Sequence, residues 1–273
     1  MKIQKLILVA IFCTIGLVDC KKDDNSDSPS NLSGSKLSKV TFGNESSTFQ
    51  YDGKGRLSKI SHGSGAYTTL EYSASTVVIK EFNEQGIQDN SYWTYTLNSK
   101  GLATTCSYNE AGLSGKIVGI RSNSHLKNAF TILAASDILT TYEYDANGFL
   151  IKEVYPETNE TKNYVISNGN VVSSFSTWEW GYENTYQYLA NSTNTIFDDD
   201  FDMGGNENIG IYFMGKRNTN LISAITERVK DEYGTFHTYQ YSYSYEFDSK
   251  NRVTKKTSSS QNDSYVTTYT YIN

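Results

Sequence analysis

Aromatic and polar residues alternate strictly between positions 239 and 247, and this alternation is the clearest pattern in the chain. Five aromatic residues share one parity: Tyr239, Tyr241, Tyr243, Tyr245 and Phe247. Successive side chains of a β-strand point to opposite faces, so the segment is predicted to be a strand with one aromatic face and one polar face. Residues 248–251 interrupt the alternation, and a return strand is predicted to begin at Arg252.

The turn that follows this strand recurs along the chain. Each copy opens with Asp or Asn, and the four copies open at Asp52, Asn98, Asp145 and Asp248. The short side chain of Asp or Asn can accept hydrogen bonds from backbone N–H groups a little further along the turn. A later position in each copy is predicted to have positive φ, which Gly adopts freely and Asn adopts at modest cost. These positions are Gly55, Gly101, Gly148 and Asn251.

Short segments with strand-like composition continue from residue 38 to the C-terminus, separated by turns. The candidate strands lie at 38–43, 47–52, 56–61, 66–73, 76–82, 91–97, 102–108, 138–144, 149–155, 161–167, 170–180, 184–190, 220–230, 236–247, 252–258 and 264–272. Strands joined by short turns pair antiparallel, and a sheet of about sixteen strands must curl, split or close. The predicted fold class is therefore all-β, a large antiparallel meander of β-hairpins curled into a barrel or half-barrel. The dipeptide Asn168–Gly169 predicts one of its hairpin turns.

The return strands after the repeated turns do not fit a simple alternation of inward and outward residues. Leu57, Leu150 and Val253 share parity with Lys59, Lys152 and Lys255. Either a bulge shifts the alternation, or the lysine stems lie along apolar surface with their charges at its rim.

Two stretches lack the strand-and-turn pattern. Residues 110–136 include eight large apolar residues without a clean period, and they are predicted to hold either a short helix near 126–135 or two irregular strands. Residues 197–217 are rich in Asp, Gly and Asn. Irregular stretches of this length are where function tends to reside in a protein built of strands and tight turns.

The N-terminal residues have the composition of an export signal. Lys2 and Lys5 precede an apolar run at 6–18 that is too short for a permanent membrane-spanning helix, so residues 1–19 are predicted to be a signal peptide. The run ends in the sequence LVDC, which resembles a bacterial lipobox and implies that Cys20 becomes lipidated after cleavage. The alternative is an ordinary secretory signal with an incidental cysteine.

Residues 20–36 are predicted to be a lipidated cysteine followed by a flexible tether, since they are mostly Ser, Asp, Asn and Lys with little that could pack. The two lysines and two aspartates at 21–24 resemble the signal that sends Bacteroidetes lipoproteins to the outer face of the outer membrane. We therefore expect a protein held at the outer membrane through lipid on Cys20 and facing the cell exterior. Residues 37–273 are expected to form a single antiparallel β domain.

Charge and cysteine content narrow the possible functions. The formal net charge is −6, and removing the two lysines and one aspartate of the signal peptide makes it −7, which argues against a nucleic-acid partner. Cys13 and Cys20 belong to the export signal, and Cys106 alone cannot form an internal disulfide. The mean hydropathy of −0.52 favours a soluble barrel over a membrane-spanning one, which needs an apolar outward band. We expect a monomer.

The segment from Tyr51 to Lys59, YDGKGRLSK, is similar to the tyrosine–aspartate repeats of wall-associated and Rhs-type proteins. Taken with the lipobox-like sequence, the chain length and the segment MGKRNTNL at 214–221, it makes residues 20–273 resemble a Bacteroidetes lipoprotein family of unknown function with a porin-like fold. The resemblance implies a curved, barrel-like antiparallel sheet. It implies no known activity and therefore no functional residues.

The sequence contains no catalytic motif with a defined mechanism: there is no G-x-S-x-G, H-E-x-x-H, C-x-x-C or P-loop. The three histidines are scattered and are predicted to be exposed or structural. The acidic stretch at 198–204 resembles a calcium loop, but Met203 and Ile209 stand where such a loop needs Gly and Glu. A solvated loop is therefore predicted, and we expect no metal and no cofactor.

The aromatic residues are the remaining signal. Tyrosine is unusually frequent, with 22 copies. Trp178, Trp180 and Tyr182 share one parity, in a strand predicted to reach residue 180, and Trp93 lies in another strand. Such rings either fill a wide barrel interior or line a groove that stacks on sugar rings or holds an apolar ligand. Trp178, Trp180, Tyr182 and Trp93 are therefore the candidate ligand-binding residues.

Two function classes stay open from the sequence. The first is a surface-exposed binding or accessory module with a glycan or another surface polymer as its ligand. The second is a structural or shell-like repeat protein without a small ligand. An enzyme is less favoured, and a glycoside hydrolase, which would need two carboxylates about 5–9 Å apart in a cleft, ranks third.

Overall fold

The computed structural model describes residues 36–110, 116–119, 130–133, 138–178, 181–196 and 212–272. The predicted signal peptide at 1–19, Cys20 and Trp180 lie outside the described residues, as does the acidic stretch at 198–204. No helix in the described ranges is long and apolar enough to cross a membrane.

Within these ranges the chain forms strands and turns, which confirms the predicted all-β class. In chain order the strands are β1 (Leu37–Phe42), β2 (Glu45–Tyr51), β3 (Leu57–His62), β4 (Tyr67–Tyr72), β5 (Thr76–Phe82), β6 (Gln88–Leu97), β7 (Ala103–Glu110), β8 (Lys116–Gly119), β9 (Phe130–Leu133), β10 (Thr140–Tyr144), β11 (Leu150–Tyr155), β12 (Glu160–Ser167), β13 (Asn170–Ser176), β14 (Tyr182–Tyr188), β15 (Ile222–Lys230), β16 (Phe236–Phe247), β17 (Val253–Ser259) and β18 (Ser264–Tyr271). A 3-10 turn, η2 (Tyr212–Met214), lies between β14 and β15.

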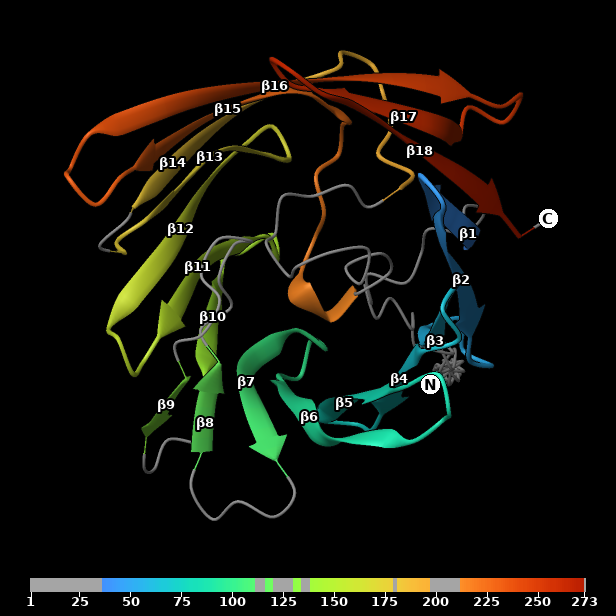
Figure 1. Cartoon of the computed structure of the whole chain (residues 1–273), viewed down its shortest axis with the longest axis vertical. Helices are drawn as coiled ribbons and strands as arrows, with labels where there is room; N and C mark the ends of the chain where they lie inside the picture. The colour runs from blue at the N-terminus through green and yellow to red at the C-terminus, as the bar shows by residue number, and fades with distance from the viewer. Residues whose placement is uncertain are drawn as a thin grey trace, which may run out of the picture.

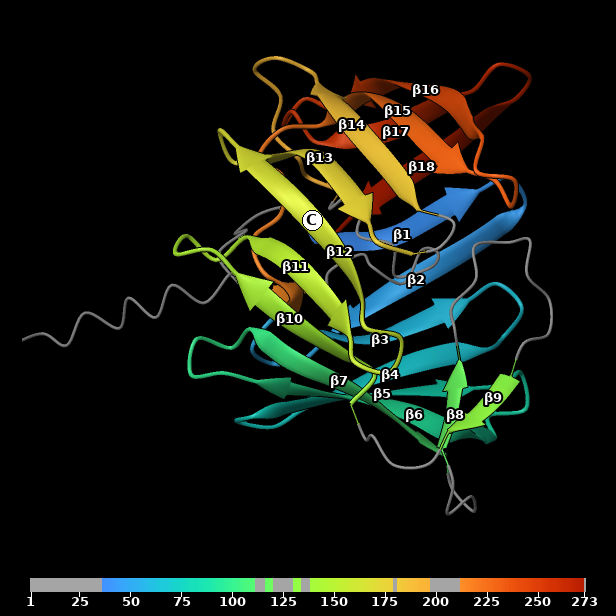
Figure 2. The same ribbon diagram turned by 90° about the vertical axis from the view of Figure 1, so that its left-hand side faces the viewer.

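Sixteen of these strands form a closed antiparallel barrel (Figure 1). Each strand pairs with its neighbour in the chain, except that β7 pairs with β10 and the first strand, β1, pairs with the last, β18. The predicted barrel is thus closed rather than half open. β8 and β9 pair with each other as a separate two-stranded sheet, drawn in front of β6 in Figure 2, so the two-strand alternative for residues 110–136 is confirmed.

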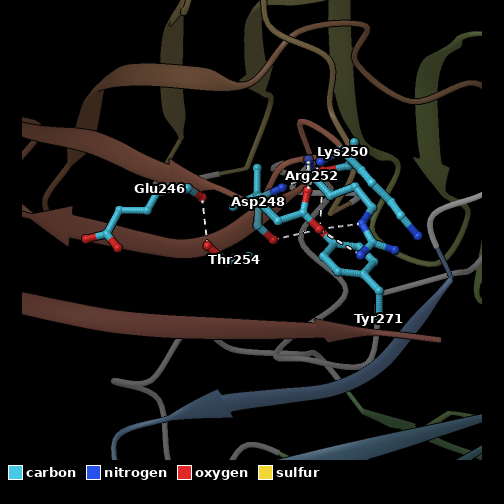
Figure 3. A network of polar contacts seen from close by, with 8 residues as sticks. Glu246, Asp248, Lys250, Arg252, Thr254 and Tyr271 are labelled. Carbon is cyan, nitrogen blue, oxygen red and sulfur yellow. Dashed lines mark hydrogen bonds and ion pairs between the residues drawn. The ribbon is translucent and has the colours of Figure 1, made fainter. Parts of the chain in front are cut away.

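The repeated turn has the geometry that the sequence predicts. Gly55, Gly101 and Gly148 have φ of 80°, 76° and 88°, and Asn251 has φ of 59°. In the turn drawn in Figure 3, Asp248 Oδ1 accepts hydrogen bonds from the backbone N–H groups of Lys250 and Arg252, both at 2.9 Å. The Asn168–Gly169 hairpin turn is confirmed as well, with positive φ at both residues.

Two further copies of this turn were not predicted from the sequence. Asn83 Oδ1 accepts hydrogen bonds from the N–H groups of Gln85 and Ile87, and Asp231 Oδ1 accepts them from Tyr233 and Thr235. They join β5 to β6 and β15 to β16, at the end of the barrel opposite the four predicted copies. The turn chemistry therefore serves both ends of the barrel.

A bulge beside each of the four predicted turns shifts the alternation of the return strand. The register slips between Gln50 and Tyr51, and Leu57 then pairs with Tyr51. Equivalent slips occur at Thr96/Leu97, Glu143/Tyr144 and Glu246/Phe247. Each slip lets the first residue of the return strand point inward, while the lysine that follows in three of the copies points outward. The bulge, rather than a lysine stem on apolar surface, explains the shared parity.

The outward face of the wall carries cross-strand ion pairs, together with exposed hydrophobic side chains such as Val165 and Phe175. These pairs are Lys80–Glu71 at 2.8 Å, Lys152–Glu143 at 3.3 Å, Arg228–Glu183 at 2.9 Å and Lys255–Glu246 at 2.7 Å. The most deeply buried residues lie on the opposite parity, on the inner wall. They include the first residue of each return strand, and Leu57, Ala103, Leu150 and Val253 are all 0% exposed.

One end of the barrel is filled by the connection between β14 and β15, and η2 lies within the ring of strands in Figure 1. We call residues 189–196 and 212–221 the plug. Its buried side chains include Ile196, Phe213, Met214 and Leu221, and the ring of Phe213 lies 4.9 Å from that of Tyr95. Backbone N–H groups of Lys216 and Thr219 donate to the carbonyls of Gly148 and Gly169. The plug thereby closes the end that carries the four predicted turns, here called the plugged end.

Candidate functional site

The structure brings two of the four candidate aromatic residues together. Trp178 follows β13 and Tyr182 begins β14, and their ring centroids are 6.0 Å apart with planes at 83°. Trp93 lies on β6, five positions from β13 in the strand order, and its ring packs 5.4 Å from Tyr108. Trp180 lies outside the described residues, so the structure does not place it.

The strand predicted at 170–180 is too long, and this changes the environment of Trp178. β13 ends at Ser176, where the hydroxyl oxygen accepts the N–H of Tyr182 at 3.1 Å and helps to close the connection to β14. The prediction that Trp178 and Trp180 leave the same side of one strand is therefore wrong, because Trp178 belongs to this connection. It lies at the end of the barrel opposite the plug.

Trp178 is held between two tyrosines from different strands. The ring of Tyr155, the last residue of β11, lies 5.6 Å away at 68°, and the ring of Tyr182 contacts it from β14. Edge-on contacts of this kind add about 0.5–1.5 kcal/mol beyond simple burial. The indole Nε1 is buried, and it has no hydrogen-bond partner within the described part of the chain. This corner of the barrel thus contains an unused hydrogen-bond donor among aromatic rings.

Tyr186 and Tyr188, which continue the aromatic row along β14, have a different role. The Tyr186 hydroxyl lies 2.8 Å from Ser174 Oγ, and the Tyr188 hydroxyl donates to the carbonyl of Val171 at 2.5 Å. Both belong to the hydrophobic core or pack against it. The tyrosines of β14 therefore belong to the core near the plug, while Tyr182 belongs to an aromatic cluster near the opposite end.

Two charged residues beside this cluster were not predicted as site residues. Glu153 on β11 and Lys162 on β12 are direct partners across the sheet, and both fall on the inward parity. Lys162 is only 2% exposed, and its ammonium lies 5.3 Å from the ring centroids of both Tyr164 and Tyr182. The strand alternation could have identified Lys162, because this residue lies on the same side of β12 as the inward Tyr164 and Ile166.

Glu153 is held by hydroxyl groups. The hydroxyl of Tyr155 donates to one carboxylate oxygen at 2.9 Å, and the hydroxyl of Tyr164 donates to the other. Burial, and then the negative charge of Glu153, raise the pKa of Tyr164 well above its usual value. Tyr142, the partner of Glu153 on β10, also has a raised pKa, chiefly through burial. These phenols therefore stay protonated near neutral pH and remain hydrogen-bond donors.

We call Glu153, Tyr155, Lys162, Tyr164, Trp178 and Tyr182 the inner-wall cluster. It combines aromatic edges, an indole donor, a buried cation and a carboxylate fixed by two phenols. Aromatic surface with a few placed polar groups is the usual composition of a site for an organic ligand. The described residues contain no group of His, Cys, Asp and Glu that could hold a metal ion.

Cys106 is buried on the inner wall, where it pairs with Tyr95 of β6 and Thr140 of β10. Its side chain lies in the hydrophobic core cluster. The described position is that of a small buried hydrophobic residue.

The strand order defines the class of protein: it is a sixteen-stranded, closed antiparallel barrel with one plugged end. Among solved structures, the chain is similar to a porin-like protein from Bacteroides uniformis, with a TM-score of 0.57 and 18% identity over 86% of this chain and 98% of that one. A porin-like protein from Bacteroides vulgatus gives a TM-score of 0.56 and 15% identity over 87% and 99% of the two chains.

No protein-family profile matches the sequence, and no curated protein is significantly similar to it. The solved structures share its fold at low identity, so they confirm the predicted porin-like barrel. The lipoprotein and tyrosine–aspartate repeat parts of the resemblance stay predictions.

Proposed function

We propose that the protein is a binding module at the cell surface, tethered to the outer membrane through lipid on Cys20, and that it binds a glycan or another surface polymer at the inner-wall cluster. The export signal and the lysine–aspartate sequence after Cys20 support the location. The ion-paired outer face supports a barrel that stands in water beyond its tether, because charged pairs are costly against lipid.

The observation that carries the proposal is the environment of Trp178. A buried N–H group without an acceptor costs about 1–3 kcal/mol, and Trp178 Nε1 is one of seven buried side-chain atoms without a hydrogen-bond partner in the described residues. Sugar hydroxyls are acceptors as well as donors, and the apolar faces of sugar rings pack on aromatic side chains. A sugar oxygen next to Nε1 would recover the missing hydrogen bond while Tyr155 and Tyr182 hold the ring.

The experiment compares Trp178→Phe with Trp93→Phe on an array of plant, host and bacterial polysaccharides. Phe keeps an aromatic ring but removes the N–H donor, so Trp178→Phe should fold and should lose less stability than the about 3–5 kcal/mol expected for truncation of a buried Trp to Ala. We expect it to lose most of the binding shown by the wild type. Trp93→Phe is the matched control, because Trp93 is also on the inner wall but lies outside the cluster, and it should bind normally. Wild-type binding that survives in Trp178→Phe would contradict the proposal.

The proposed tether has its own test. Metabolic labelling with a palmitate analogue should mark the wild type and leave Cys20→Ala unmarked. If the wild type is labelled as proposed, protease treatment of intact cells should also remove it from the surface. Equal labelling of both proteins would contradict lipidation at Cys20.

A structural or shell-like role is the second candidate, and the packing of the plugged end favours it. The plug and the fully buried first residues of the return strands fill that half of the barrel. In this case Trp178→Ala should cost about 3–5 kcal/mol, as for a large ring in a core, and no polysaccharide should bind. A small loss of stability together with lost binding would instead favour the binding module.

A further inference from the structure

The hairpin of β15 and β16 extends past the neighbouring strand of the barrel wall. β16 pairs with β15 from Phe236 onward, whereas β17 ends at Ser259, whose partner on β16 is Ser242. Residues 236–240, which we call the β16 edge, therefore have β15 on one side and no described strand on the other. In Figure 1 this hairpin extends to the left past the tip of the β17–β18 hairpin.

The turn before β16 determines which backbone groups point to the open side of the β16 edge. The N–H of Asp231 donates to the carbonyl of Thr235, so this pair closes the ladder between β15 and β16. In an antiparallel pair, successive residues point their N–H and C=O groups alternately toward the partner strand and away from it. The residues that point away from β15 are therefore Phe236, Thr238 and Gln240. Their open-side N–H and C=O groups have no partner among the described residues.

The β16 edge lacks the features by which proteins keep exposed strand edges from pairing. Such edges usually carry charged side chains, proline or a bulge, or they are short or covered. The sequence of this edge, FHTYQ, contains no proline and no acidic or basic side chain apart from a histidine, and its register with β15 is regular. All of its residues are exposed, and the rings of Phe236 and Tyr239, on opposite faces, are 49% and 46% exposed. A strand added here would find an aromatic ring on each face.

The space beside the β16 edge fits one short extended peptide better than a second copy of the chain. The edge spans about 17 Å, at 3.4 Å for each of its residues. In antiparallel pairing of two such edges about Thr238, Phe236 of the second copy would lie opposite Gln240, and its 231–235 turn would then collide with β17 at Ser259. The paired edges would also bury far less than the about 800 Å² per partner that a stable dimer needs.

The charges around the β16 edge favour a basic partner. The hairpin at 222–241 and the neighbouring turn at 260–263 carry four carboxylates, which belong to Glu227, Asp231, Glu232 and Asp263. The basic residues of the hairpin are Arg228, already paired with Glu183, and Lys230. The whole chain has a net charge of −6. Complementary charge steers a partner to such a surface and opposes binding of like-charged segments.

We propose that the β16 edge is a docking site for a basic, extended peptide segment of another protein, which adds to the barrel wall as a further strand. Main-chain hydrogen bonds supply the affinity of such strand addition, and alternate side chains supply its specificity. The partner's side chains would pack beside Phe236 on the outer face and Tyr239 on the inner face. β1 begins at the plugged end, so the proposed tether leaves the β16 edge clear of the membrane. The inference does not depend on the polysaccharide site.

The test uses the full chain and a fluorescein-labelled octapeptide of alternating lysine and valine, with binding measured by fluorescence anisotropy. The variant is Thr238→Pro, which removes one N–H on the open side and leaves the ladder to β15 intact. The matched control is Thr238→Val, which changes the same side chain and keeps the N–H. We expect the wild type and the control to bind alike, and Thr238→Pro to lose affinity by about tenfold or more. An octapeptide of alternating glutamate and valine should bind the wild type about tenfold more weakly or worse.

Amide hydrogen exchange of the wild type, resolved by residue, tests the same geometry without a variant. In the free protein the amides of Thr238 and Gln240 should exchange faster than those of His237 and Tyr239, and saturation with the basic peptide should slow the first pair. This measurement decides the matter if Thr238→Pro does not fold. No binding of the basic peptide, or unchanged exchange at Thr238 and Gln240 in its presence, would overturn the proposal. A wild-type dimer in sedimentation that Thr238→Pro abolishes would also overturn it and assign the edge to a second copy.

Discussion

The sharpest test of the fold is a substitution at Gly148, in the turn between β10 and β11. Its φ of 88° lies in the left-handed region, which a residue with a Cβ enters only at a cost. A Cβ on Gly148 would meet only Leu102 Cδ1, at 3.9 Å, which is an ordinary contact distance. The cost of a small substitution at this position is therefore backbone strain and not a collision.

The magnitude depends on the residue introduced. Strain at such a position is about 1–3 kcal/mol for a non-glycine residue, and a β-branched side chain belongs at the upper end. Gly148→Val should therefore lower the free energy of unfolding by about 2–3 kcal/mol. Gly148→Asn should cost well under half as much, because Asn tolerates this region and Asn251 occupies the equivalent position at φ of 59°.

Urea denaturation of the two variants and the wild type measures the difference directly. Gly53→Val is the matched control: Gly53 belongs to an equivalent turn, its φ is not positive, and a Cβ there would meet no atom within 4 Å beyond its chain neighbours. The control should unfold almost like the wild type. Equal free energies for Gly148→Val and Gly148→Asn would refute the assignment of strain to this position.

Two further predictions concern the same end of the barrel. The backbone N–H and side chain of Arg252 donate hydrogen bonds to Asp248 and, together with the charge of Arg252, hold the pKa of the Asp248 carboxyl below its usual value. The ionised carboxylate therefore stabilises the folded protein above about pH 4, and this stabilisation is lost as the pH falls through the pKa of the folded state. Asp248→Asn keeps the turn but cannot ionise, so the gap in melting temperature between wild type and variant should shrink as the pH is lowered from about 7 to about 3; a constant gap would contradict this. Gly215→Ala should destabilise by at least about 2 kcal/mol, because Gly215 has positive φ and a Cβ there would lie 2.8 Å from the Gly148 carbonyl oxygen. Gly101→Ala is the comparison, because Gly101 also has positive φ but a Cβ there would meet no atom within 4 Å. Urea denaturation that gives the two alanine variants equal stability would rule out the collision at Gly215.

Much of the barrel could be predicted because its signals are local. Two patterns extend over only a few residues: alternation within a strand, and Asp or Asn shortly before a residue with positive φ. They predict all sixteen wall strands within a few positions of their observed places. The turns at Asn83 and Asp231 were missed because they do not follow the spacing of the other four. They lie at the opposite end of the barrel, where they connect the other set of strand pairs.

The plug and the inner-wall cluster could not be predicted, for a different physical reason. The plug is positioned by long-range contacts, such as Val171 N–H donating to Asn218 Oδ1 and Thr195 Oγ1 accepting the N–H of Val253. Such contacts leave no period in the sequence. The alternation of 170–176 continues through Trp178 and predicts a strand there, and only the β13–β14 connection at Ser176 and Tyr182 shows otherwise.

At Lys162 the strand alternation correctly predicts the direction of the side chain, whereas the general preference of lysine for water does not. Alternation points this residue inward, while composition alone would put a lysine in water. Lys80, Lys152 and Lys255 face outward with carboxylate partners, whereas Lys256 shares the inward parity of Tyr243 and Tyr245. Natural sequences break such agreement mainly at functional sites, where another gain offsets the cost. A nearly enclosed lysine and a buried indole N–H without a described acceptor, both in the half of the barrel away from the plug, are therefore the reason to look for a ligand there.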